Sequence, residues 1–165
     1  MTHVAEHCIA GPLLRRAIRP RRVASARARP RCRDRRWPEV AAALVSLRAA
    51  RRCSVRIVDA DCGSGALLLC AVRYARALGF TAIEARGIDD TPALVGRARA
   101  SAMVLHDAAI GITFEKGDLV RALDEEADFP ADIVMWHGCA GCSAEEVQAV
   151  ACAGHRLIAD PVVVA

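Results

Sequence analysis

The sequence predicts an α/β fold, a doubly wound and mostly parallel sheet of about five strands with helices on both faces. Short apolar runs of strand type alternate with helical patterns from position 55 to 160. The stretch Val55–Leu68 combines a buried strand, a glycine turn and a helix start. Asp59, Asp89 and Asp118 follow three consecutive predicted strands. These three observations define the fold class.

Composition agrees with one folded domain. The chain of 165 residues and 17.6 kDa is long enough to bury a core. Its residues are 54% hydrophobic, yet no apolar run approaches the roughly 20 residues that a membrane helix needs. We therefore expect a soluble protein with no membrane partner. The eight cysteines show no repeated spacing, which favours a reducing, cytoplasmic compartment.

Charge divides the chain into two parts. Residues 1–52 carry 14 arginines and three acidic residues, a net charge of +11, whereas the remainder has a net charge of −7. Residues 1–36 lack periodicity and contain scattered prolines, so we expect a basic arm that is disordered or loosely packed, ahead of a domain at 37–165. RNA or a protein could bind this arm, and an organellar presequence is the alternative interpretation.

The first predicted helix begins at Trp37, with Pro38 in its first turn and apolar residues at helical spacing. We expect it to cover the edge of the sheet. The strand at 55–58 then leads into a helix at 64–78, which Gly79 ends.

Later elements follow the same alternation. Strands are predicted at 81–88, 111–115, 132–136 and 155–159. Thr91 and Pro92 predict the start of a helix after the second strand. Ser143 and Glu146 have the spacing of a capping box, which predicts a helix before the fifth strand.

Ligands of doubly wound sheets bind at the carboxyl ends of the strands. Gly63 and Gly65 would let the backbone approach a ligand closely there. Carboxylates beside such a turn suit a ligand with ribose hydroxyls, an exocyclic amine and positive charge. Asp89 could accept hydrogen bonds from a ribose, and Asp118 could accept one from an adenine amino group.

Five segments resemble, in order, the motifs of the class I S-adenosylmethionine-dependent methyltransferases. Val-Asp-Ala-Asp-Cys-Gly-Ser-Gly at 58–65 resembles the first motif, Gly-Ile-Asp-Asp-Thr-Pro at 87–92 the second, and Glu-Lys-Gly-Asp-Leu at 115–119 the third. Ala-Asp-Ile-Val-Met-Trp-His at 131–137 resembles the fourth strand, and Gly-His-Arg-Leu-Ile-Ala-Asp at 154–160 the next. The resemblance implies a Rossmann-like methyltransferase core, which here looks truncated after the fifth strand.

This resemblance implies roles for individual residues toward S-adenosyl-L-methionine. Asp59 would lie near the methionine amino group, and Asp61 stands where the family turn has its first glycine. The remaining cofactor-binding residues are Gly63 and Gly65 in the turn, Asp89 with Asp90 at the ribose, and Asp118 with Leu119 at the adenine.

The loop after the fourth strand is where the family binds the methyl acceptor. Trp136 and His137 would contact the acceptor, with His137 as a candidate general base. The loop reads Trp-His-Gly-Cys instead of Asn/Asp-Pro-Pro-Tyr/Phe, which argues against a nucleic-acid amino-methyltransferase and favours a small-molecule acceptor. His137, Cys139 and Cys142 could alternatively form a zinc or redox site, but we expect no metal because no second ligand pair is present.

Two other functions remain open at this point. The chain could be a non-catalytic, cofactor-binding remnant or regulatory module, which Asp61 and the short C-terminal part would favour. It could also be a nicotinamide-dependent oxidoreductase, although Leu68 stands where that fingerprint needs Gly or Ala. A homodimer would be compatible with any of these functions.

Overall fold

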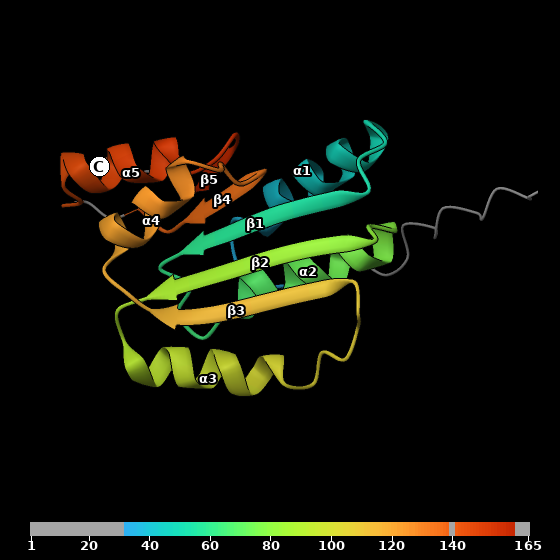
Figure 1. Ribbon diagram of the computed structural model, residues 1–165, viewed down its shortest axis with the longest axis horizontal. Helices are drawn as coiled ribbons and strands as arrows, with labels where there is room; N and C mark the ends of the chain where they lie inside the picture. Colours follow the sequence, from blue (N-terminus) through green and yellow to red (C-terminus); the bar gives the residue numbers. More distant parts are fainter. Residues whose placement is uncertain (1–31, 139–140, 161–165) are drawn as a thin grey trace, which may run out of the picture.

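The computed structural model describes residues 32–138 and 141–160. It contains a five-stranded parallel sheet in the order β3-β2-β1-β4-β5, which confirms the predicted fold class (Figure 1). The strands are β1 (Ser54–Ala60), β2 (Ala82–Asp89), β3 (Ile110–Lys116), β4 (Ile133–Trp136) and β5 (Leu157–Ala159). The helices are α1 (Trp37–Ala49), α2 (Ala66–Leu78), α3 (Pro92–Ala102), α4 (Leu119–Ala127) and α5 (Ala144–Cys152).

Helices cover both faces of the sheet because successive strand residues point to opposite sides. Ile57 belongs to a core cluster with buried residues of α1, α2 and α3. The next residue, Val58, belongs to a second cluster with residues of α4 and α5. The two clusters explain why β1 is buried on both faces from Ile57 to Ala60 instead of showing an alternating pattern.

The chain changes direction across the sheet between β1 and β4. From β1 it moves outward to β2 and β3, then returns to place β4 and β5 on the other side. Asp59 pairs in register with Gly87 of β2 and with Met135 of β4. The carboxyl ends of all five strands lie at one edge, so the switch point beside β1 is where a ligand is expected (Figure 1).

Two elements differ from the prediction. The ring of Trp37 packs edge-on against Tyr74 of α2, with 5.4 Å between centroids, so α1 lies beside α2 on one face and does not cover the sheet edge. The helix α4 has no predicted counterpart. Its buried residues include Glu126 as well as Ala122 and Leu123, so an acidic residue interrupts the apolar pattern that would have indicated a helix.

The predicted arm is described only from Cys32 onward, and its remaining residues, 1–31, lie outside the described part of the chain. Within 32–36, Arg36 is only 3% exposed and contacts residues of the domain. We therefore propose that the domain begins at or before Asp34, since Asp34 forms an ion pair with Arg36. No helix in the described ranges has both the length and the apolar character needed to cross a bilayer.

Candidate functional site

The turn after β1 has a left-handed backbone at three alternate positions. Asp61, Gly63 and Gly65 have φ values of 60°, 56° and 75°. A Cβ atom on Gly65 would lie 2.6 Å from the ring of Phe114, so this position needs glycine for both backbone and space. A Cβ on Gly63 would meet nothing within 4 Å. The predicted glycine turn is therefore present, with Gly65 packed and Gly63 open.

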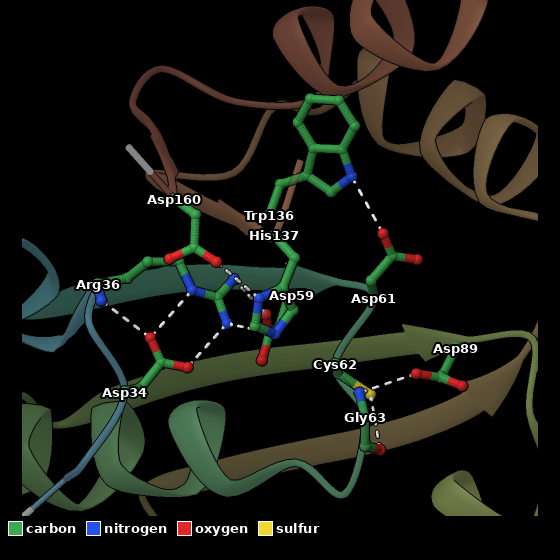
Figure 2. Close-up of polar contacts among 10 residues, drawn as sticks. All are labelled: Asp34, Arg36, Asp59, Asp61, Cys62, Gly63, Asp89, Trp136, His137 and Asp160. Carbon is green, nitrogen blue, oxygen red and sulfur yellow. Dashed lines mark hydrogen bonds and ion pairs between the residues drawn. The ribbon is translucent and has the colours of Figure 1, made fainter. Parts of the chain in front are cut away.

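Asp89 fixes this turn from the end of β2. Its Oδ2 accepts a hydrogen bond from the backbone N–H of Gly63 at 2.8 Å (Figure 2). Its Oδ1 accepts one from the backbone N–H of Thr91 at 2.8 Å. The residue is 8% exposed. Because a carboxylate has about four acceptor positions, Asp89 retains capacity for two hydroxyl groups. Its orientation is fixed by the backbone before any ligand arrives.

A small pocket of ≈ 150 Å³ lies at the carboxyl ends of β2 and β3. It brings together five of the predicted cofactor residues: Asp61, Asp89, Asp90, Asp118 and Leu119. Ile88, Gly117, Val120 and Glu146 complete the lining. Asp118 also caps α4, accepting a hydrogen bond from the N–H of Arg121, while Asp90 accepts one from the hydroxyl of Thr91.

The pocket is acidic and narrow. Five of its lining side chains are carboxylic acids, which favours a cationic or neutral ligand over a pyrophosphate. Its volume of ≈ 150 Å³ is below the roughly 300–1,000 Å³ of typical small-molecule sites. A nucleoside-sized ligand would therefore need additional space along the same edge of the sheet.

A second polar group lies beyond the pocket, around Asp59. This carboxyl group is fully buried, and burial raises its pKa to about 7. The Arg36 guanidinium favours ionisation, but its Nη1 lies 3.8 Å from Oδ1 of Asp59, too far for a hydrogen bond. Neither oxygen of Asp59 accepts a hydrogen bond from the residues that the structure describes.

Besides Asp59, Arg36 contacts two other side chains, Asp34 and His137, and His137 in turn contacts Asp160 (Figure 2). Nε and Nη2 of Arg36 donate to the two carboxylate oxygens of Asp34, and Nη2 also lies 3.0 Å from Nε2 of His137. Because a guanidinium can only donate, Nε2 of His137 must be the acceptor. The proton of a neutral ring is then on Nδ1, which lies 2.9 Å from Oδ2 of Asp160. Both ring nitrogens of His137 are engaged, so the ring could serve as a base only after its contact to Arg36 is released.

Trp136 ends β4 and joins the two groups. Its side chain is buried in the cluster with α4 and α5, and its indole N–H donates to Oδ2 of Asp61 at 3.1 Å (Figure 2). The structure thus places Trp136 next to the turn after β1, and His137, the following residue, over Asp59.

Sequence reasoning missed four residues of this edge. Asp34 and Arg36 fall in the predicted arm, where the many arginines give no sign that one of them is buried. Glu146 is predicted only as part of the capping box. Asp160 appeared only as the end of a motif. Pairing of an acid with the buried Arg36 could have been suspected from Asp34-Arg-Arg36 directly before Trp37.

The alternative metal or redox site lies partly outside the described part of the chain, because Cys139 falls in the gap at 139–140. Among the residues on either side of that gap, no group of three or more His, Cys, Asp or Glu side chains is arranged to hold a metal ion.

Comparison with solved structures addresses the fold. WbdD aligns with a TM-score of 0.50 and 20% identity over 64% of this chain and 24% of that chain. A Listeria monocytogenes protein described as a class I S-adenosylmethionine-dependent methyltransferase gives a TM-score of 0.47 and 22% identity over 64% of this chain and 31% of its own. A Geobacter sulfurreducens S-adenosylmethionine-dependent methyltransferase, bound to S-adenosyl-L-homocysteine, gives 0.43 and 26% over 68% of this chain and 43% of its own.

No protein-family model and no curated protein matches the chain. The chain spans less than half the length of each of these three solved proteins. The parallel order β3-β2-β1-β4-β5 with helices on both faces is a doubly wound, Rossmann-like architecture. The likeness concerns this fold.

Proposed function

We propose that the chain is an S-adenosylmethionine-dependent methyltransferase. The observation that carries the proposal is the pocket at the ends of β2 and β3, where Asp89, Asp118 and Leu119 meet beside the glycine turn. These residues would hold the adenosyl part of the cofactor, which supplies an activated methyl group when bound.

The chemistry of the lining residues fits this cofactor. Asp89 is held by two backbone N–H groups and keeps free acceptor positions for two ribose hydroxyls. Asp118 accepts one hydrogen bond as the cap of α4, and its remaining acceptor positions are available to an amino group. The several carboxylates suit the positive charge of the sulfonium and would repel the pyrophosphate of a nicotinamide dinucleotide.

The acceptor would approach from the switch point, over β1 and β4. Trp136 and His137 stand there, together with Asp160 from the end of β5. We propose a small-molecule acceptor positioned by these side chains, with His137 as the base once its contact to Arg36 is released. Transfer of this kind depends mainly on alignment of the reacting atoms.

Isothermal titration calorimetry with S-adenosyl-L-methionine, S-adenosyl-L-homocysteine and NAD tests the proposal. We expect both adenosyl ligands to bind and NAD not to bind. Asp89→Ala should weaken adenosyl binding at least about 100-fold, since two charge-assisted hydrogen bonds of roughly 1.5 kcal/mol each are lost. Asp124→Ala is the matched control, because Asp124 is an exposed acid of α4 outside the pocket.

The alternative functions give different results in the same titration. NAD binding without adenosyl binding would support the oxidoreductase and contradict the proposal. Tight S-adenosyl-L-homocysteine binding without methyl transfer to any acceptor of a small-molecule panel would support the non-catalytic module. Normal ligand binding by Asp89→Ala would show that the site is elsewhere.

A further inference from the structure

Arg36 and Asp59 carry polar atoms that no described residue satisfies. Nη1 of Arg36 and both carboxylate oxygens of Asp59 are buried and lack a hydrogen-bond partner within 32–138 and 141–160. The two side chains are each about 1% exposed. Burying such atoms unpaired is costly, so a partner other than the described residues is expected.

The remaining atoms of Arg36 are already used. Nε and Nη2 are held by Asp34, and Nη2 is shared with His137, which leaves Nη1 as the free end of a fixed guanidinium. Asp34 therefore orients Arg36 in the way that a supporting carboxylate orients a binding residue. The 3.8 Å separation from Asp59 leaves donor and acceptor side by side but not bonded to each other.

A neighbouring free donor and free acceptor match a zwitterion. Nη1 can donate to a carboxylate, and Asp59 can accept from an ammonium group. The α-carbon of an amino acid carries both groups close together. A simple anion would be repelled by Asp59, and a simple cation would be repelled by Arg36.

Position along the sheet edge points to the same kind of ligand. The pocket with Asp89 and Asp118 is too small for a whole nucleoside derivative, and Asp59 lies near the carboxyl end of the neighbouring strand β1. Asp61 lines that pocket and is two residues from Asp59. A ligand that starts in the pocket and crosses the glycine turn would reach Arg36 and Asp59 next.

We infer that Arg36 binds the carboxylate of the amino-acid part of the adenosyl ligand, next to the ammonium group on Asp59. This inference rests on the proposed function and adds to it a residue from outside the five recognised motifs. Arg36 would then determine specificity for ligands with an intact α-amino acid.

The test compares S-adenosyl-L-homocysteine with its decarboxylated analogue, which lacks only the carboxylate. By calorimetry, we expect the wild-type chain to prefer S-adenosyl-L-homocysteine by at least about tenfold, the factor that corresponds to one charge-assisted hydrogen bond. Arg36→Gln should remove this preference by weakening S-adenosyl-L-homocysteine alone. Arg36→Lys should restore part of it, because the charge returns without the planar fork.

Arg35→Gln is the matched control, since Arg35 is an exposed neighbour of the same type. It should leave both affinities unchanged. Unchanged binding of the decarboxylated analogue by Arg36→Gln also reports that the variant is folded and that its adenosyl pocket is intact.

Each other outcome overturns a stated claim. If the wild-type chain binds both ligands equally, Arg36 does not bind the carboxylate, and the inference fails while the proposed function stands. If Arg36→Gln weakens both ligands equally, Arg36 has only a structural role. If the wild-type chain binds neither ligand, the proposed function fails and the inference fails with it.

Discussion

The carboxylate of Asp61 accepts a hydrogen bond from the indole N–H of Trp136, with 3.1 Å between Oδ2 and Nε1. This bond crosses the switch point, because Asp61 follows β1 and Trp136 ends β4. Asp61 has a left-handed backbone, which Asp tolerates better than most side chains. Asp61, which stands at the first position of the glycine turn, thus provides the hydrogen-bond acceptor for the buried Trp136.

Substitution of Asp61 separates its structural role from ligand binding. Asp61→Gly relieves about 1 kcal/mol of backbone cost but leaves the Trp136 N–H without its partner, which costs about 1–3 kcal/mol. We expect a net loss of about 1 kcal/mol of unfolding free energy in urea denaturation. Asp61→Asn keeps an acceptor and should be close to wild type. Affinity for S-adenosyl-L-homocysteine should be spared or increased in Asp61→Gly, and a large loss would assign Asp61 a direct contact.

Stability should depend on pH through Asp59. Its pKa in the fold is about 7 because of burial, against 3.8 for the ordinary side chain. Between these values the folded chain holds a proton that the unfolded chain has released, so the stabilising contribution is full below pH 3.8 and is lost as pH rises through 7. The unfolding free energy of the wild type relative to Asp59→Asn should therefore fall from about pH 5 to about pH 8. A difference that is constant with pH would mean that Asp59 is already ionised at the lower value.

The two glycines of the turn should differ in their tolerance of alanine. Both have positive φ, so Gly63→Ala and Gly65→Ala each carry roughly 1–2 kcal/mol of left-handed strain. Only Gly65→Ala also drives a methyl group against the Phe114 ring, which adds about 1–3 kcal/mol. Urea denaturation should show the larger loss for Gly65→Ala. Equal losses would mean that the Phe114 ring moves aside at little cost.

Two adjacent acids of α4 should differ in how much their replacement by alanine lowers the unfolding free energy, because only one of them is buried in an ion pair. Glu126 is 1% exposed and pairs with Arg56 and Arg86, whereas the Glu125 side chain is 65% exposed and pairs with Arg86 alone. Glu126→Ala removes a buried carboxylate partner from both arginines, but Arg56 keeps Glu84 and Arg86 keeps Glu115 and Glu125, so we expect a loss of about 1–3 kcal/mol. Glu125→Ala is the control and should cost less than about 1 kcal/mol. Thermal and urea unfolding of both variants measure the difference, and similar losses would place the stabilisation in helix propensity.

Much of the fold could be predicted because β1 and the turn after it have local sequence signals. An apolar run followed by Gly63 and Gly65 predicts strand, turn and helix without knowledge of distant residues. The apolar pattern of α4 is incomplete because Glu126 takes a buried position, where it pairs with Arg56 and Arg86, although Asp118 as a helix cap is a local signal of this helix. A single sequence gives no sign that a buried acid has two partners so far along the chain.

The sequence alone determined the order of the five strands and of four of the five helices, and with it the positions of Asp59, Asp89 and Asp118 near strand ends. Periodicity and glycine content are local properties of the sequence, so they can be recognised without knowledge of the fold. Only the tertiary structure shows that Arg36, one of many arginines near the start of the chain, is buried beside Asp59. The same holds for the hydrogen bond that Trp136 donates to Asp61. Both contacts join residues tens of positions apart: the parallel register of β1 and β4 brings Asp61 to Trp136, and the placement of the segment before α1 brings Arg36 to Asp59. The candidate site therefore combines carboxylates whose positions the sequence motifs predict with an arginine whose position depends on tertiary packing.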